Sequence, residues 1–394
     1  MALHEGKRKL ESIPVGKLGV IALSSCEDLG KRVDKFLVDW RTERENEHKN
    51  TLAFAGYQRD SYLINTKISR FGTGEAKGTV LESIRGMDLF LLVDVCNYSK
   101  TYKVCGKENH MSPDDHYQDL KRIIAALGGK ARRISVIMPF LYEGRQHRKS
   151  SRESLDCALA LQELVGMGVD NILTFDAHDA RVQNAIPLNG FDSIQPAYQF
   201  MKGLLYNIKD LQIDAEHMMV ISPDEGGMNR AIYLANVLGL DMGMFYKRRD
   251  YTTVVDGKNP IVAHEFLGSN VAGKDVIVVD DMISSGESIL DVATELKNRK
   301  ANRVFLLSTF GLFTNGLDVF DDAYEKGIFD KVLTTNAVYQ PQELLERDYY
   351  ISCDISKYIA FLIDTLNHDS SISDLLNPNG RIQRLVARYK NGLI

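Results

Sequence analysis

The chain has 394 residues, 44% of them hydrophobic and 26% charged, proportions typical of a globular protein with room for two domains. Its formal net charge of -5 argues against general attraction to nucleic acid or to an anionic membrane. No apolar run approaches the roughly 18 residues that cross a bilayer, and the basic N-terminus has no apolar segment behind it. The five cysteines form no CxxC pair. We therefore expect no membrane insertion and no secretion, and a reduced, cytoplasmic setting.

Short apolar, β-branched runs alternate with helical segments along most of the chain. The predicted strands, in chain order, are 19–23, 89–95, 134–139, 172–176, 218–222, 276–280, 303–308 and 332–335. Predicted helices between them include 154–167, 226–238 and 286–299. The strand runs are continuously apolar, as expected of strands covered on both faces. This alternation predicts an α/β fold with mainly parallel sheets.

Two strand–loop–helix–strand units, 134–176 and 276–308, indicate two related halves with a boundary near 188–195. Because any α/β protein repeats such units, the pattern leaves the duplication open. The resulting division gives an N-terminal α/β domain at 1–190, a C-terminal α/β domain at 191–369 and a tail at 370–394.

Three segments look peripheral. The densely charged run 39–50 is expected to be a solvated helix end and loop, and the polar run 96–116 a long loop. The end of the chain after Asp369 is expected to add a small helix.

The most informative segment is 276–288, with the sequence VIVVDDMISSGES. A buried strand ends in Asp280 and Asp281 and passes through a Ser/Gly turn into a helix, whose N-terminus suits an anionic phosphate. Gly286 permits close backbone approach to a ligand. Hydroxyl donors come from Ser284, Ser285 and Ser288. Helix capping by one Asp or Ser is the structural alternative, and the whole unit argues against it.

This segment resembles the phosphoribosyl diphosphate-binding motif of ribose-phosphate pyrophosphokinases and phosphoribosyltransferases. The resemblance implies a cradle for the 5-phosphate at 284–288 and contacts from Asp280 and Asp281 to the ribose diol. The family's loop has a Thr-Gly-Thr-like sequence, whereas Glu287 follows the glycine here.

A basic segment, PFLYEGRQHRK at 139–149, places guanidinium groups after a predicted strand, an arrangement that suits polyphosphate. Nucleic acid is the rival ligand, disfavoured by the acidic chain. The segment resembles the family's FGYARQDRK, which implies that Arg145 and Gln146 contact ATP, with His147 in place of the usual acid.

Two further strand ends carry matching motifs. TFDAHD at 174–179 resembles the family's DLH element, which implies that His178 lies beside the ATP phosphates and ligates Mg²⁺. A lone His at a strand end is otherwise more often structural than a ligand. VISPDEGGMNR at 220–230 resembles SPDAGG, which implies that Asp224 contacts ribose or its metal.

The remaining matches are shorter. Lys247 and Arg249 correspond to the KRR that opens the family's flexible catalytic loop. Phe71 and Glu75 match FSDGE, which contributes to an adenine site from a neighbouring subunit. Thr73 replaces its Asp, and Phe310 replaces the His of THGLFSG.

Together these resemblances imply two phosphoribosyltransferase-like, Rossmann-like domains that transfer diphosphate from ATP to ribose 5-phosphate with Mg²⁺. They also imply a homodimer or homohexamer with a shared ATP site. A regulatory homologue without turnover stays open because of the departures from the family pattern at Thr73, His147, Glu287 and Phe310. A phosphoribosyltransferase is the other alternative, but it would leave TFDAHD and GRQHRK unexplained.

Overall fold

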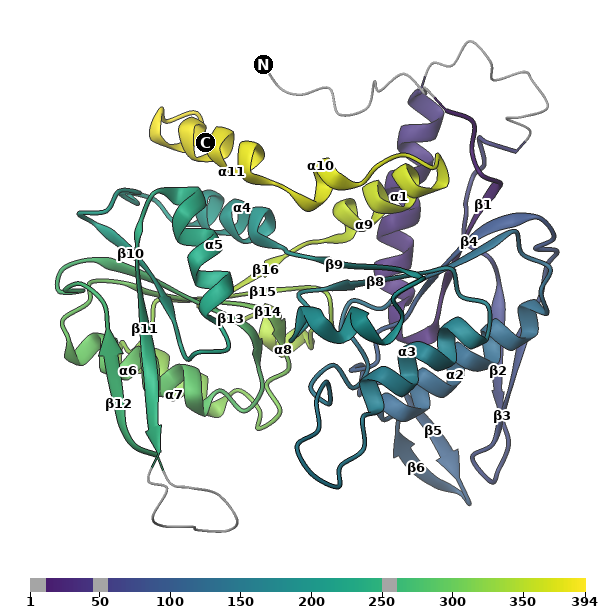
Figure 1. The fold of residues 1–394 in the computed structure, drawn as a ribbon, viewed down its shortest axis with the longest axis horizontal. Helices are drawn as coiled ribbons and strands as arrows, with labels where there is room; N and C mark the ends of the chain where they lie inside the picture. Colours follow the sequence, from purple (N-terminus) through teal and green to yellow (C-terminus); the bar gives the residue numbers. More distant parts are fainter. Residues whose placement is uncertain (1–11, 45–55, 250–260) are drawn as a thin grey trace. The chain divides into compact units, whose positions relative to one another are not determined.

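The computed structural model describes residues 12–44, 56–249 and 261–394. The chain divides into two compact units (Figure 1). Unit 1 comprises Met1–Gln195, Ala337–Tyr339 and Ile355–Leu376, and unit 2 comprises Pro196–Asn336, Gln340–Asp354 and Asn377–Ile394. This division differs from the predicted one at 190 and 369, because the segment 355–369 belongs to unit 1 and the predicted tail is split between the units.

Unit 1 contains a five-stranded parallel sheet of order β1-β4-β7-β8-β9. Its strands are β1 (Lys17–Ala22), β4 (Met87–Leu92), β7 (Arg133–Ile137), β8 (Asn171–Phe175) and β9 (Gly190–Ile194). Two antiparallel hairpins lie outside it: β2 (Thr66–Arg70) with β3 (Ala76–Val80), and β5 (Thr101–Val104) with β6 (Lys107–His110).

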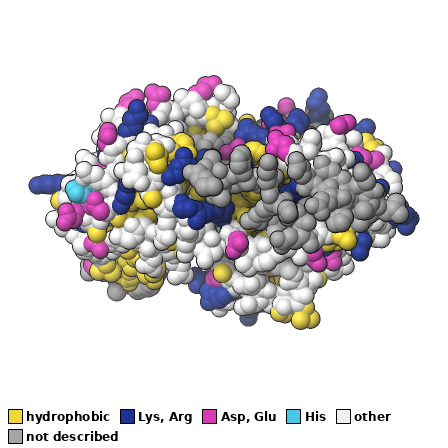
Figure 2. Space-filling view, turned by 90° about the horizontal axis from the view of Figure 1, so that it is seen from above, with side chains coloured by type: hydrophobic (Ala, Val, Ile, Leu, Met, Phe, Trp, Pro, Cys, Tyr) yellow, Lys and Arg dark blue, Asp and Glu magenta, His cyan; other side chains and the backbone are white. Residues whose placement is uncertain are grey.

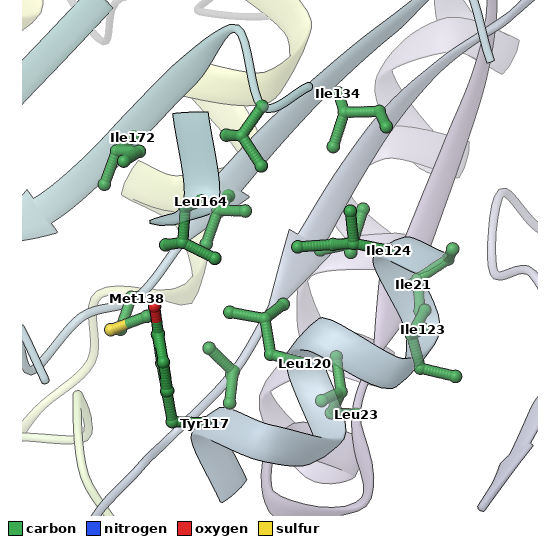
Figure 3. Packing of buried hydrophobic residues seen from close by; sticks show 14 of the residues in the cluster. Ile21, Leu23, Tyr117, Leu120, Ile123, Ile124, Ile134, Met138, Leu164 and Ile172 are labelled. Carbon is green, nitrogen blue, oxygen red and sulfur yellow. The ribbon is translucent and has the colours of Figure 1, made fainter. Parts of the chain in front are cut away.

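Helices cover both faces of the unit 1 sheet. They are α1 (Glu27–Glu43), α2 (Pro113–Leu127), α3 (Asp156–Gly166), α9 (Ser356–Asn367) and α10 (Ser373–Leu376). On one face, Leu120 and Ile124 of α2 and Leu164 of α3 share an apolar cluster with the strands (Figure 3). On the other, the Tyr358 ring of α9 packs edge-on against Phe175 of β8.

Unit 2 contains a seven-stranded sheet of order β12-β11-β10-β13-β14-β15-β16, parallel except for the β11–β12 pair. Its strands are β10 (Met218–Ser222), β11 (Asp241–Arg249), β12 (Ile261–Leu267), β13 (Asp275–Ile283), β14 (Val304–Gly311), β15 (Lys331–Thr335) and β16 (Tyr350–Cys353). Its helices are α4 (Ala197–Asn207), α5 (Met228–Leu238), α6 (Glu287–Asn298), α7 (Asp318–Glu325), α8 (Gln342–Leu345) and α11 (Asn379–Lys390).

Alternate residues of β13 belong to two different apolar clusters, which explains why this strand is apolar throughout. Val276 and Val278 pack with α6 and α7, whereas Ile277 and Val279 pack with α4, α5 and α11. A strand buried on both faces has no polar side to alternate with. The predicted α/β class, with two mainly parallel sheets flanked by helices, is confirmed.

The segment 96–116 is not the long loop predicted from its polar composition. It contains the β5–β6 hairpin and the start of α2. Ser112 and Asp115 form a capping box at the N-terminus of α2, with Pro113 in the first turn. The hairpin escapes detection because its strand residues are polar and largely exposed.

The run 39–50 is a helix end in its described part, as predicted, but only Asp39, Thr42 and Glu43 are exposed there. Helix α1 extends to Glu43, and Trp40, Arg41 and Arg44 are buried against α9. The predicted terminal helix is present as α11, and it is docked on unit 2: Tyr389 accepts a hydrogen bond from the backbone N–H of Leu211 at 3.0 Å.

The surface carries both signs of charge. On the face shown in Figure 2, basic and acidic side chains are intermixed among neutral ones. Within the described ranges, no helix combines the length and apolar character needed to cross a membrane.

Candidate active site

Neighbouring strands of unit 2 bring three acidic residues to the carboxyl edge of its sheet. Strand β10 pairs with β13 through Ile221 and Val278, so Asp280 lies two residues beyond that pair, beside the loop that carries Asp224. Asp281 follows directly, and its backbone N–H donates to Asp280 Oδ1 at 2.8 Å. The carboxyl ends of parallel strands are where open α/β sheets bind ligands.

The two neighbouring acids change the titration of Asp280. Burial, followed by the negative charges of Asp281 and Asp224, raises the pKa of Asp280 well above its ordinary value. Arg230 of α5 approaches Asp281, with Nη2 to Oδ2 at 3.7 Å. A bound cation, or hydroxyl groups that donate hydrogen bonds, would stabilise the charged form of this group.

Asp224 also shapes the loop in which it lies. Its Oδ1 accepts hydrogen bonds from the backbone N–H groups of Gly226 at 2.9 Å and Gly227 at 3.2 Å, just before α5 begins. The Ser222 hydroxyl donates to the Asp224 carbonyl at 2.6 Å. One carboxylate oxygen of Asp224 is thus engaged in holding the turn.

The turn after β13 leads directly into α6, as predicted. Gly286 stands at the N-cap with φ of 92°, a conformation that favours glycine. A Cβ there would come within 2.4 Å of the buried Phe320 ring, so the glycine is required by packing beneath the loop as well. Ser284 and Ser285 are partly buried, while Glu287 in the first helical turn is exposed. The first N–H groups of a helix have no partner within it and suit an anion.

Lys247 and Arg249 stand on an extension of the same sheet edge. Strand β11 pairs with β10 as far as Met244, opposite Ser222, and then continues with β12 alone. Lys247 pairs with His264 in that two-stranded arm (Figure 1), beyond the carboxyl end of β10. The flexible loop expected from the family resemblance falls largely at 250–260, outside the described residues.

In unit 1, the basic segment predicted to bind ATP follows β7 as a loop. Arg145, Gln146, Arg148 and Lys149 are exposed along it. The backbone N–H of Gln146 donates to the Glu143 carbonyl at 2.8 Å, which makes a tight turn at the start of the basic run.

His147 and His178 meet in unit 1 from the loops after the neighbouring strands β7 and β8. Their ring centroids lie 5.3 Å apart. His147 Nε2 is 3.4 Å from Asp179 Oδ2, and Asp179 in turn pairs with Arg181. Hydrogen bonding from Arg181 lowers the pKa of Asp179 below its ordinary range.

Phe71 and Glu75 occupy the turn between β2 and β3. The Phe71 side chain is 52% exposed, and Glu75 accepts a hydrogen bond from the Thr73 hydroxyl at 3.0 Å. An ion pair between Arg70 and Asp119 of α2, at 2.6 Å, connects the hairpin to that helix. Phe310, by contrast, is buried in β14.

The comparisons with known proteins agree over most of the chain. Residues 18–168 match the family model described as the N-terminal domain of ribose phosphate pyrophosphokinase, and residues 190–344 match the phosphoribosyl transferase domain. The chain belongs to the ribose-phosphate pyrophosphokinase family. The two matches fall on the two predicted related halves.

Curated relatives carry the same name. The ribose-phosphate pyrophosphokinase of Vibrio parahaemolyticus is 28% identical over 320 residues, covering 80% of this chain and 92% of the relative. That of Pasteurella multocida is 28% identical over 317 residues, with 79% and 90% covered. Phosphoribosylpyrophosphate synthetase from Mycobacterium smegmatis shares the fold with a TM-score of 0.70 at 22% identity, covering 90% of this chain and all of that one.

The sequence analysis did not single out three residues that lie beside the candidate site residues: Asp176, Asp179 and Arg230. Asp176 directly follows β8, has φ of 40° and accepts a hydrogen bond from Gln195 at 3.0 Å; strain of this kind often marks a functional site. The sequence feature that could have identified Asp176 is its place as the acid of the D-x-H pattern that ends in His178. Arg230 and Asp179 had no distinguishing pattern, because their roles arise from contacts made in the folded chain.

The described residues include no cluster of three or more His, Cys, Asp or Glu with metal-binding geometry. The acidic donors nevertheless fit a hard cation, since Asp280 is partly buried beside the carboxylates of Asp281 and Asp224. Mg²⁺ commonly uses one or two carboxylates and completes its shell with water and substrate phosphate.

Proposed function

We propose that this chain is a ribose-phosphate pyrophosphokinase that transfers the β,γ-diphosphoryl group of ATP to O1 of ribose 5-phosphate and releases AMP. The observation that carries the proposal is the arrangement at the carboxyl edge of unit 2. Asp224, Asp280 and Asp281 meet there beside a Ser/Gly turn that opens a helix. The name and coverage of the curated relatives support it.

In this proposal the hydroxyls and backbone of the turn after β13 bind the 5-phosphate at the N-terminus of α6. These groups are Ser284, Ser285, Gly286 and Ser288. Asp280 and Asp281 accept hydrogen bonds from the ribose diol and fix the position of the anomeric hydroxyl. Transfer of a phosphoryl-type group requires mainly positioning and charge neutralisation, so this orientation is the chief contribution of unit 2.

The cationic side chains neutralise the polyphosphate. Lys247 and Arg249 are the proposed catalytic cations for charge that develops on the transferred group. Arg145 and Gln146 are proposed to bind ATP. His178 and Asp224 are the proposed metal ligands, and Mg²⁺ is the proposed ion, which would neutralise diphosphoryl charge when bound.

The assembly proposal rests on the tip of the β2–β3 hairpin. Phe71 is a large aromatic residue with half its surface exposed, next to a carboxylate at Glu75. We propose that this tip contacts the adenine of a neighbouring subunit in a homodimer or homohexamer. A cytoplasmic location fits the proposed substrates.

One assay tests the function. The chain is incubated with ATP, Mg²⁺ and ribose 5-phosphate, and AMP is measured; AMP should form only when the sugar phosphate is present. ATP binding without AMP would favour the regulatory homologue, and consumption of phosphoribosyl diphosphate with a free base would favour a transferase. Asp280→Asn should lose activity, whereas Asp291→Asn, on the exposed face of α6, should retain it.

A further inference from the structure

The β5–β6 hairpin lies against the turn between β2 and β3, residues 71–75. The backbone N–H of Cys105, at the tip of the β5–β6 hairpin, donates to the Gly72 carbonyl at 2.7 Å. The packing beside this bond is close as well, because a Cβ added to Gly74 would come within 3.1 Å of Val104 Cγ2. Gly74 also has φ of 92°, a conformation that favours glycine. The tips of the two hairpins are therefore in direct contact.

Tyr102 of β5 connects this contact to helix α2. Its hydroxyl donates to Asp115 Oδ1 of α2 at 2.9 Å, and its ring receives the Arg70 guanidinium, with Cζ 4.4 Å from the ring centroid. Arg70 immediately precedes the β2–β3 turn, and it pairs with Asp119 of α2 at 2.6 Å. The Arg70 side chain is only 14% exposed, and a cation–π contact that is shielded from water is the stronger for it. One aromatic side chain thus holds the end of β2 beside α2.

The β2–β3 hairpin needs such support at its tip. Two antiparallel strands alone are marginally stable in water. Farther along the strands, α2 supplies support, since a Cβ added to Gly78 of β3 would come within 2.9 Å of the Arg122 carbonyl oxygen. The turn lies beyond the last β2–β3 pair, Arg70 with Ala76, and the Phe71 side chain within it is 52% exposed. A loop that is not held in place loses conformational entropy when it binds a ligand.

We propose that the β5–β6 hairpin holds the β2–β3 turn in the conformation that binds the nucleotide, with Tyr102 as a positioning residue. The inference rests on the proposed function in one respect, since it takes the turn to contact adenine. Ordering the turn before binding removes an entropic cost, so the hairpin contributes affinity without touching the ligand. Adenine is remote from the reacting phosphates, so this contribution is equal in the ground state and the transition state. It therefore acts on the KM for ATP and leaves kcat unchanged.

The competing explanation is that the β5–β6 hairpin stabilises unit 1 and has no effect on ligand binding. Its outward-facing residues, such as Thr101 and Lys107, are exposed. Among the described residues, those of the apolar cluster that joins α2 to the sheet include none from 101–110. A hairpin outside the core adds little to its stability. A purely structural role would change the stability of unit 1 without changing ATP affinity.

Two variants separate the ring of Tyr102 from its hydroxyl. Tyr102→Leu removes both, and it should raise the KM for ATP about 3- to 30-fold while kcat and the KM for ribose 5-phosphate stay unchanged. Tyr102→Phe keeps the ring face that receives Arg70, and it should recover most of the affinity. The matched control is Thr101→Leu, because Thr101 is the exposed neighbour of Tyr102 on the opposite face of β5. It should leave all three constants unchanged.

The hairpin can also be removed as a whole. The backbone N–H of Met111 donates to the Lys100 carbonyl at 2.8 Å, as it would across a two-residue turn, so residues 101–110 can be replaced by Asn-Gly. This variant should weaken ATP binding at least as much as Tyr102→Leu does. Hydrogen exchange followed by mass spectrometry should show faster exchange of the peptide that spans 71–75 in both variants.

The outcomes separate this proposal from the proposed function. Unchanged exchange of the turn in Tyr102→Leu would overturn the proposal, as would faster exchange with unchanged ATP affinity. A smaller assembly by light scattering would also overturn it, because the hairpin would then act through contacts between subunits. ATP affinity is measured by calorimetry without ribose 5-phosphate as well. A chain that forms no AMP but loses ATP affinity in Tyr102→Leu would therefore refute only the proposed function.

Discussion

Asp364 of α9 lies between two buried arginines of unit 1, and replacing it by Asn isolates their charge. Arg41 Nε donates to Asp364 Oδ1 at 3.0 Å, and Arg44 Nη2 donates to Oδ2 at 2.6 Å. Arg41 also donates to Asn367 at 2.7 Å, and Asn367 donates to the buried Asp88 at 2.8 Å. The cluster fastens α1 to a helix more than 300 residues away in sequence.

The size of the expected loss of stability can be derived from the shifted pKa of the Asp364 carboxylate. Burial alone would raise the pKa of Asp364, but the charges of Arg41 and Arg44 outweigh it and lower the pKa from 3.8 to about 2. This shift corresponds to roughly 2 kcal/mol in favour of the charged form. Asp364→Asn also leaves two guanidinium groups buried without a counter-charge, so we expect a loss of about 3–5 kcal/mol.

The loss of stability in Asp364→Asn should depend on pH in a characteristic way. A folded-state pKa below the unfolded value stabilises the protein at pH values above the unfolded pKa, and the contribution is lost as pH falls through the folded pKa. The difference between the unaltered chain and Asp364→Asn should therefore be complete above about pH 4 and shrink toward pH 2.

Hydrogen exchange of the α1 and α9 amides, followed by mass spectrometry, measures the loss locally and avoids assuming that both units unfold together. The control is Asp28→Asn, on the exposed first turn of α1, where the Lys31 pair at 3.8 Å contributes at most about 0.5 kcal/mol. A change below about 1 kcal/mol in Asp364→Asn would refute the reasoning that the buried charges are balanced by this carboxylate.

Three further predictions concern the site and its supports. Gly286→Ala should destabilise unit 2 by about 1–3 kcal/mol in thermal unfolding, and Phe320→Leu should recover only the part due to the ring clash, since the backbone strain remains. Lys247→Ala should lower AMP formation on the order of 10²- to 10³-fold with the fold intact by circular dichroism; near-normal turnover would remove Lys247 from the catalytic role. Burial raises the pKa of Asp94 to about 7, so its contribution to the free energy of unfolding should fall as pH rises from about 4 to 7; denaturant unfolding of Asp94→Asn should show a flatter slope there.

Strand positions could be predicted because each predicted strand is covered on both faces, which makes its sequence continuously apolar. The loops that follow β10 and β13 could be predicted because the sequence changes abruptly there from apolar to polar residues. Polar residues such as Asp224 and Asp280 directly after an apolar run have few structural uses, so their pattern points to a ligand.

Burial of charge could not be predicted in the same way. Arg41 belongs to a run of charged residues whose local pattern indicates a solvated surface, and only the distant Asp364 makes its burial favourable. The β5–β6 hairpin has the same difficulty. Its strands have exposed, polar side chains, and its placement depends on Tyr102, whose ring receives the Arg70 guanidinium at 4.4 Å. The burial of Arg41 and the placement of the hairpin both depend on contacts between residues that are far apart in the sequence.

The four departures from the family pattern differ in what they do to the structure. Phe310 is buried in β14, and Glu287 is exposed to solvent. The Thr73 hydroxyl donates a hydrogen bond to the carboxylate of Glu75, a residue that matches the family motif. Neither Phe310 nor Glu287 removes a contact that the proposed reaction uses in unit 2, and Thr73 belongs to unit 1. His147 lies beside His178, with ring centroids 5.3 Å apart, and its Nε2 is 3.4 Å from Asp179 Oδ2. These positions therefore do not by themselves favour the regulatory homologue over the proposed enzyme.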